Sequence, residues 1–249
     1  MKVLVCIDDT DNLETKGTGH LAAAMAQSIE EMAWGKCSPI TRHQLYVHED
    51  IPYTSHNSTM CFAAGISARH LESLIEYAAG ILRAESAPGS DPGLCVAVIE
   101  QIPDQELLIS FGQTAKREVL TKEKAYATAK LAGVHLSEHG GTGQGVVGAL
   151  AGIGLRLSGN DGRVKGKFKL ECRNSIITVQ QILQQTMVDQ VRSLDGVVLN
   201  PDVKVFVSEE LVKAIYQEHK IVLPVFASTE EASPITGWRT CSKQQLRVF

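Results

Sequence analysis

Residues 2–12 read Lys-Val-Leu-Val-Cys-Ile-Asp-Asp-Thr-Asp-Asn, an apolar, β-branched run that ends in an acidic turn. This pattern predicts a buried strand that delivers its C-terminal end to a functional site. After Gly17 and Gly19, residues 20–32 combine alanines with spaced large apolar side chains. That spacing predicts a helix packed closely on the sheet.

The rest of the chain continues with strands and helices. Strands are predicted at 41–47, 59–64 and 94–99, and helices at 68–83, 106–119 and 121–132. We therefore expect an α/β (α+β) fold in which packed helices cover a mixed sheet. The predicted division is a larger region at 1–165 and a small accessory module at 166–249. Within the module, strands are favoured at 203–207 and 221–227.

The composition predicts a globular protein of a reducing compartment. Of the 249 residues, 44% are hydrophobic, which is enough to fill a core. The net charge of -4 argues against a surface built wholly for a polyanion. The six cysteines form no C-x-x-C pair, which indicates buried thiols rather than a zinc finger or a disulfide framework. The first apolar run is too short for a signal peptide and no long apolar stretch follows, so we expect a cytoplasmic protein without a membrane span.

Asp8, Asp9 and Asp11 form a cluster of carboxylates at the end of the first predicted strand. Such groups repel one another unless a cation or protons neutralise them. Because Mg²⁺ prefers a few carboxylates together with water and phosphate oxygens, the cluster predicts a magnesium site that accompanies ATP. One alternative is a turn in which the aspartates cap backbone groups and the following helix. Another is a phosphatase in which Asp9 and Asp11 form an Asp-x-Asp pair.

Residues 140–154 read Gly-Gly-Thr-Gly-Gln-Gly-Val-Val-Gly-Ala-Leu-Ala-Gly-Ile-Gly. Glycines let backbone N–H groups approach an anion, and a helix that begins near Val146 would direct its positive end to the same place, which predicts a phosphate contact. The order of these residues also matches a dinucleotide-binding motif, which is weak evidence at this position in the chain. The alternative is that Gly148, Gly152 and Gly154 serve close helix packing.

Four segments then occur in a recognisable order. They are Ile7–Asn12 with Gly17-Thr18-Gly19, Pro52–Asn57, Asp91-Pro-Gly93, and Gly143–Gly154. Together they resemble the catalytic half of archaeal tRNA-Ile agmatinylcytidine synthetase, over about the first 160 residues. The resemblance implies a kinase-like catalytic region with a ferredoxin-like βαβ element. It also implies a shorter homologue without the tRNA-binding barrel and the zinc ribbon of the family, since Cys241 is the single cysteine after Cys172.

In that family the acidic loop and the glycine segment bind ATP with magnesium, and phosphate transfer activates a cytidine carbonyl for attack by agmatine. The resemblance implies catalytic roles for Asp8, Asp9, Asp11 and Thr18, with the three aspartates as metal ligands. It implies nucleotide contacts for Thr10, Gly17, Gly141, Thr142, Gly143, Gln144 and Gly145. Thr18 matches a threonine that is phosphorylated in the family, whereas an ordinary helix N-cap is the alternative at this position.

Two segments depart from the family pattern. Where the family loop carries Lys and Arg, this chain has Thr54 or Ser55 and His56. His56 and Asn57 are therefore the predicted substrate residues there, with a plain surface histidine as the alternative. After the glycine helix, Asn160 and Asp161 are predicted to line the same cleft, with a simple Asn-Asp-Gly turn as the alternative.

Basic side chains follow that turn. Arg163, Lys165, Lys167 and Lys169 alternate as on one face of a strand. This face could contact an anionic substrate, and a solvated strand face is the alternative.

These features predict an ATP- and magnesium-dependent phosphotransferase or ligase-like enzyme that acts on a small molecule. Two alternatives remain open. One is a nucleotide-binding sensor or regulatory protein without catalysis. The other is an RNA-modifying enzyme that recruits a separate RNA-binding subunit, although nucleic acid is not the favoured partner. The sequence is compatible with a homo-oligomer.

Overall fold

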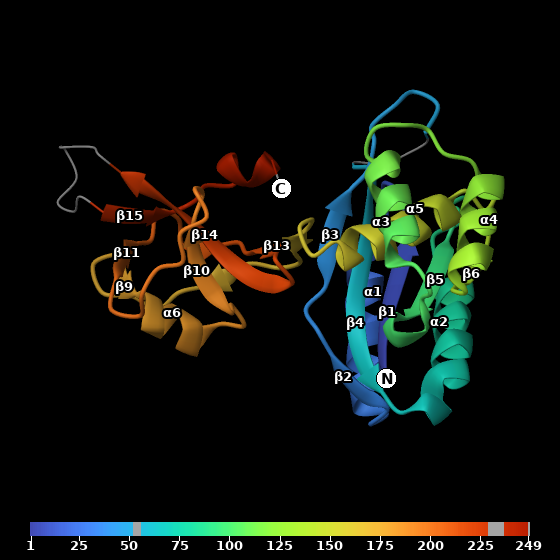
Figure 1. Cartoon of the computed structure of the whole chain (residues 1–249), viewed down its shortest axis with the longest axis horizontal. Helices are drawn as coiled ribbons and strands as arrows, with labels where there is room; N and C mark the ends of the chain where they lie inside the picture. The colour runs from blue at the N-terminus through green and yellow to red at the C-terminus, as the bar shows by residue number, and fades with distance from the viewer. Residues whose placement is uncertain (52–55, 229–236, 249) are drawn as a thin grey trace. The chain divides into compact units, whose positions relative to one another are not determined.

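The computed structural model describes residues 1–51, 56–228 and 237–248 (Figure 1). The chain divides into two compact units, Met1–Ser158 and Gly159–Phe249. This boundary falls before Gly159, whereas the sequence placed it after residue 165. Within the described residues, no helix has both the length and the apolar character needed to cross a membrane.

The first unit is built on an antiparallel sheet. Its strands are β1 (Lys2–Asp8), β2 (Gly35–Cys37), β3 (Thr41–Gln44), β4 (Ser58–Ile66), β5 (Gly93–Val98) and β6 (His135–Glu138). They lie in the order β6-β5-β1-β4-β3, and β2 also pairs with β4. Neighbouring strands in this order are antiparallel. A dinucleotide-binding fold has a parallel sheet instead, so the glycine segment does not belong to such a fold.

Two helices complete the expected ferredoxin-like element. α1 (Thr18–Glu31) follows β1, and α2 (Leu71–Glu85) follows β4 after the short 3-10 helix η1 (Ala68–His70). The element order β1-α1-β3-β4-α2-β5, with β1 and β4 at the centre of the sheet, is the split βαβ arrangement of ferredoxin-like folds. The predicted α/β (α+β) class and the ferredoxin-like element are confirmed.

The two faces of this sheet carry separate cores. α1 and α2 cover one face, where Val3, Val5 and Ile7 of β1 pack. The other face lies against α3 (Gln105–Ala115), α4 (Lys122–Ala132) and α5 (Gly145–Leu157), which pack on Leu4 and Cys6. Because side chains alternate along a strand, Asp8 projects toward the α5 face, at the end of the row that Leu4 and Cys6 begin.

The second unit has a mixed sheet and its own apolar core. Its strands are β7 (Arg163–Val164), β9 (Ile176–Thr178), β10 (Gln190–Ser193), β11 (Lys204–Phe206), β13 (Ile215–Gln217), β14 (Lys220–Ser228) and β15 (Gly237–Thr240). β10 is parallel to β14 and β11 is parallel to β15, whereas β14 is antiparallel to β13 and to β15. A separate pair, β8 (Phe168–Lys169) and β12 (Leu211–Val212), helix α6 (Val179–Gln185) and the 3-10 helix η3 (Gln245–Val248) complete the unit.

One predicted element of this unit is wrong. The basic residues Arg163–Lys169 do not share one strand, because Gly166 adopts φ +99° and separates the two-residue strands β7 and β8. Lys169 instead forms an ion pair with Glu210, with 2.9 Å between Nζ and Oε1. The alternating stripe is therefore not a continuous cationic face.

The glycines of α5 allow this helix to lie directly on its neighbours. A Cβ atom on Gly152 would overlap Sγ of Cys6 on β1, and one on Gly154 would overlap the carbonyl oxygen of Leu108 on α3. A Cβ atom on Gly148 would overlap the carboxylate of Asp8. The close-packing interpretation of these three positions therefore holds.

A pair of glycine substitutions in helices tests this packing. We expect Gly154→Ala to destabilise the protein by about 1–3 kcal/mol, because the methyl group meets backbone atoms that cannot move aside cheaply. Gly80→Ala in α2 is the matched control, since the nearest atom to its Cβ position is 4.0 Å away. It should stabilise the protein by about 0.4–1 kcal/mol through the unfolded state. Urea unfolding of the two variants measures both changes in the free energy of unfolding. Changes in the same direction for both variants would contradict the packing argument.

Candidate functional site

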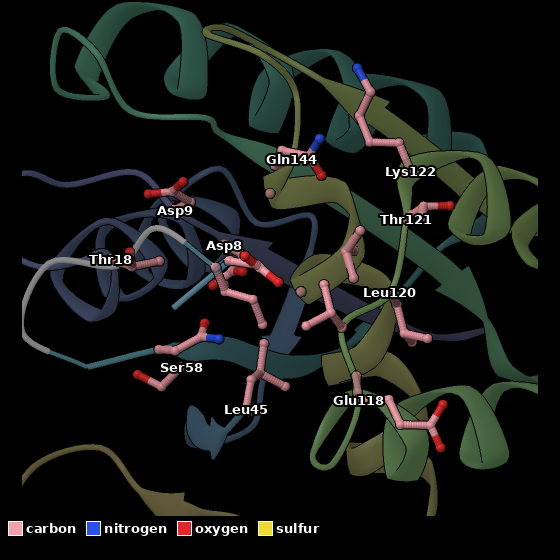
Figure 2. Close-up of a pocket in the computed structure, with 18 of the residues that line it drawn as sticks. Asp8, Asp9, Thr18, Leu45, Ser58, Glu118, Leu120, Thr121, Lys122 and Gln144 are labelled. Carbon is pink, nitrogen blue, oxygen red and sulfur yellow. The ribbon is translucent and has the colours of Figure 1, made fainter. Parts of the chain in front are cut away.

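The first unit contains a cavity of about 530 Å³ that is lined by four separate parts of the chain. These are the acidic loop after β1 with the start of α1, described residues of the β3–β4 connection with Ser58, the α3–α4 connection, and the start of α5. Figure 2 shows Asp8, Asp9 and Thr18 on one side, Leu120 and Thr121 on the other, and Gln144 above them. The volume is within the range of small-molecule sites. The acidic loop and the glycine segment, far apart in sequence, therefore line one cavity.

Asp8 is the most deeply buried of the clustered carboxylates. It is the last residue of β1 and only 8% exposed, beneath the start of α5. Burial raises the pKa of its carboxyl group well above the usual value, and the negative charges of Asp9 and Asp11 raise it further. The environment of Asp8 thus favours either a proton or a nearby cation.

Asp9 turns the chain at the end of the strand. Its φ of +50° places it in the left-handed region, which Asp tolerates better than most residues. Burial, and then the charge of Asp91, raise the pKa of its carboxyl group to about 6. At neutral pH the cavity therefore holds negative charge that the surrounding protein stabilises poorly.

Asp11 fixes the start of α1. One of its carboxylate oxygens accepts hydrogen bonds from the Thr18 backbone N–H, at 3.1 Å, and from the Thr18 hydroxyl, at 2.6 Å. The same hydroxyl accepts a long hydrogen bond of 3.4 Å from the Thr10 N–H. Gly17 is the N-cap residue and Thr18 the first residue of the helix, so Thr18 is not the N-cap. The capping alternative for the acidic loop is thus correct for Asp11, which also lines the cavity with Thr18.

The glycine segment uses most of its backbone N–H groups internally. The Thr142 N–H donates to Asp91 Oδ1, and the Gly145 N–H donates to the Asp91 carbonyl. Val146 and Val147 donate to the carbonyls of Gly143 and Gln144. Within the described residues, the N–H groups of Gly141, Gly143 and Gln144 have no acceptor. The predicted cradle from Gly141 to Gly148 is therefore reduced to these three amides, of which Gln144 lines the cavity, and the positive end of α5.

The remaining predicted residues fall in different places. His56 and Asn57 line the cavity, and the Asn57 side chain donates to the Tyr46 carbonyl at 2.6 Å. Pro52–Ser55, including the predicted Thr54 and Ser55, lie outside the described residues. Asn160 and Asp161 belong to the second unit, where Asn160 Oδ1 accepts a hydrogen bond from the Glu218 N–H. Their role in the cleft stays a prediction.

Sequence reasoning missed two polar residues of this region. Asp91 was noted merely as part of a strand entry, but its carboxylate binds the Thr142 N–H and hydroxyl. Lys122 lines the cavity and donates to the Thr142 carbonyl at 2.6 Å and to Glu138 at 2.9 Å. Lys122 directly follows Thr121, the predicted helix cap, whose side chain accepts from the Lys124 N–H. The capping pattern predicted where the helix begins, but it did not predict that the Lys122 side chain contacts the glycine segment.

The donor set is compatible with magnesium. Six acidic residues line the cavity, namely Asp8, Asp9, Asp11, Asp50, Glu118 and Glu123. The described residues contain no cluster of three or more His, Cys, Asp or Glu side chains arranged as a complete metal site. Mg²⁺ needs no such cluster, because one or two carboxylates with water and substrate phosphates satisfy it. The aspartates at the end of β1 fit that requirement.

Replacing Asp8 tests the electrostatic strain of the site. The folded-state pKa of Asp8 is raised, so the ionised carboxylate destabilises the fold, and stability falls as pH rises from about 4 through the folded pKa. Asp8→Asn removes this charge at nearly constant shape. In EDTA at pH 7.5 we expect its Tm to exceed that of the parent by a few degrees, at roughly 2–4 °C per kcal/mol. The gain should vanish near pH 4, and an equal or lower Tm at pH 7.5 would contradict the assignment.

No protein-family model matches the chain, and no curated protein matches it either. Three solved structures are similar. A crystal structure of apo TiaS, an agmatidine synthetase for an isoleucine tRNA, has a TM-score of 0.52 and 22% identity over 62% of this chain. A tRNA fluorescent labeling enzyme has a TM-score of 0.54 and 21% identity over 71%. A TiaS complex with that tRNA and ATP has a TM-score of 0.54 and 19% identity over 81%.

The matches cover 35%, 40% and 50% of those longer proteins, so this chain spans at most half their length. The first unit ends at Ser158 of 249 residues, so an alignment over 81% of the chain extends into the second unit. The segments that carry the sequence resemblance end near residue 160, and the similarity to the third structure extends beyond them. The protein has the fold of the TiaS agmatidine synthetase structures, through its first unit and into its second.

Proposed function

We propose that the first unit binds ATP with magnesium and acts as a phosphotransferase or ligase-like enzyme that activates an acceptor. The observation that carries this proposal is the meeting of the acidic loop and the start of α5 in one cavity. Carboxylates at one wall suit a divalent cation, and a helix N-terminus at another suits phosphate. The similarity to a structure described as a complex with ATP supports the same assignment.

Magnesium would be held by Asp8 and Asp9, with Asp11 next to them. When bound, it neutralises phosphate charge and orients the phosphate groups. Its binding would also relieve the repulsion that raises the pKa values of Asp8 and Asp9.

The chain's own groups would hold the nucleotide and the reacting hydroxyl. The N–H group of Gln144 and the positive end of α5 would contact phosphate oxygens. The Thr18 hydroxyl donates a hydrogen bond to Asp11 Oδ1, with 2.6 Å between the two oxygens, which orients the Thr18 oxygen in the cavity wall. This arrangement supports Thr18 as the phosphate acceptor or contact, since a carboxylate beside a hydroxyl is suited to take its proton.

The wall opposite the aspartates is partly apolar. Leu45, Val119, Leu120 and Val147 are among the apolar side chains of the cavity lining, and His56 and Asn57 lie at the end of the loop before β4. Apolar walls with a few polar groups suit the flat or aliphatic parts of a ligand. The comparisons do not favour a small molecule over a nucleic acid as the acceptor, because the similar structures include a tRNA complex.

Replacing Asp9 tests catalysis. We expect Asp9→Asn to reduce magnesium-dependent ATP turnover by at least about a hundredfold, because it removes a charge that positions the transferring phosphate. The variant should remain folded, since Asn tolerates the left-handed backbone at this position. Turnover is measured as ADP or AMP release under saturating ATP.

Asp195→Asn is the matched control for that experiment. Asp195 is exposed on a loop of the second unit and outside the cavity, so the same chemical change there should leave turnover unaltered. Undiminished turnover in Asp9→Asn would refute the assignment of Asp9. ATP binding by the parent protein without any turnover would instead favour the sensor alternative.

RNA modification is the second candidate function, and two observations favour it. The alignment with a tRNA complex extends into the second unit. That unit carries twelve Lys and Arg against ten Asp and Glu, whereas the first carries twelve against eighteen. The negative charge of the whole chain therefore resides in the first unit.

Salt dependence separates this candidate from a small-molecule enzyme. If RNA is bound through phosphate contacts, retention of a tRNA on the immobilised protein should fall by at least about tenfold between 50 and 200 mM salt. A filter-binding series measures this loss. Absence of retention at the lower salt concentration would exclude RNA binding by this chain alone.

A further inference from the structure

Thr142, in the middle of the glycine segment, is held through three of its polar groups. Its backbone N–H and its hydroxyl donate to the two carboxylate oxygens of Asp91, the hydroxyl at 2.7 Å. Its carbonyl accepts a hydrogen bond from Lys122 Nζ at 2.6 Å. A loop residue with its donors and its acceptor all engaged has little freedom to turn.

Asp91 holds the segment at two points. Besides binding Thr142 through its side chain, it accepts a hydrogen bond from the Gly145 N–H at its carbonyl oxygen, at 3.1 Å. Asp91 is 9% exposed and lies two residues before the start of β5. The carboxylate therefore lies at the end of the central sheet and is shielded from water, which strengthens its hydrogen bonds.

Lys122 holds the other side of the segment. It is the first residue of α4, and its ammonium group also forms an ion pair with Glu138 of β6 at 2.9 Å. In Figure 2 its side chain extends beyond Gln144 and away from Asp8. The lysine thus contacts the outer side of the glycine segment instead of the middle of the cavity.

The backbone of the segment depends on two glycines. Gly141 and Gly143 adopt φ values of +57° and +77°. A Cβ atom on Gly141 would overlap the Asp91 carboxylate, and one on Gly143 would overlap the Glu138 carboxylate. Both glycines are therefore needed for the close approach of these two acidic side chains.

We propose that Asp91 and Lys122 are positioning residues that clamp Thr142 and so direct the Gln144 N–H group and the start of α5 toward the phosphates of the bound nucleotide. This inference rests on the proposed function for the identity of the ligand. The clamp itself rests on the hydrogen bonds of the protein alone. In this scheme Asp91 and Lys122 act on the nucleotide through Thr142, to which both are hydrogen-bonded.

Two matched pairs of variants test the clamp in the full-length chain. Thr142→Val removes the hydroxyl that binds Asp91, whereas Thr142→Ser keeps it. Lys122→Met removes the ammonium group, whereas Lys124→Met removes the same charge at an exposed position of the same helix. The parent protein and all four variants are compared, and circular dichroism confirms that each is folded.

The first measurement needs no ligand. Amide hydrogen exchange is followed in a peptide that covers residues 139–147. We expect exchange to be faster in Thr142→Val and Lys122→Met, and unchanged in Thr142→Ser and Lys124→Met, because loosening exposes the amides that the clamp protects. Unchanged exchange in the first two variants would overturn the clamp, whatever the protein binds.

The second measurement compares the Kd of ATP with magnesium and the Kd of adenosine. We expect Thr142→Val and Lys122→Met to weaken ATP binding by about tenfold and adenosine binding by less than about twofold, since outer residues that orient direct contacts have effects of this size. Equal losses for both ligands, or none for ATP, would overturn the positioning role. If the parent protein fails to bind ATP, the proposed function fails, while the exchange experiment still decides whether the clamp exists.

Discussion

The close contact between α5 and the central strand β1 is the constraint on which the site depends. Gly148 and Gly152 carry no side chain, so the helix lies directly over Asp8 and Cys6. This contact places the positive end of α5 and the acidic end of β1 in one cavity. It also excludes water from Asp8, which is why the pKa of that carboxyl group is raised. The same helix–strand contact therefore shapes the cavity and raises the pKa of Asp8.

The elements that position the site follow from local patterns in the sequence. Alternation along Leu4, Cys6 and Asp8 predicts that the aspartate shares a face with two buried residues, and the structure places all three beneath α5. The helix pattern after Gly19 and the apolar run before Asp8 are long enough to be unambiguous. By contrast, β2 and β6 were missed, because three or four residues of mixed polarity carry no clear period.

Contacts between distant residues could not be predicted from one sequence. Asp91 binds a residue 51 positions later, and Lys122 binds one 20 positions later, and neither spacing has a local signature. The prediction of one basic strand after residue 162 was wrong for a related reason. The alternating residues predicted a strand, but the chain turns at Gly166. For Asp11, the metal-binding and capping interpretations are not exclusive, because the oxygen that caps α1 belongs to a carboxylate in the cavity wall.

Glycine content alone therefore does not identify a phosphate site in this fold. Gly148, Gly152 and Gly154 allow close helix packing, and Gly141 and Gly143 allow positive φ angles. Two N–H groups just before the helix, those of Gly143 and Gln144, have no acceptor within the described chain. The Gln144 amide and a helix end of roughly half a positive charge lie at a cavity lined by six acidic residues and by Lys122. A triphosphate alone would be repelled from such a cavity. In the proposed function, a cation therefore enters with the phosphate, so the metal and the nucleotide should bind as one ligand.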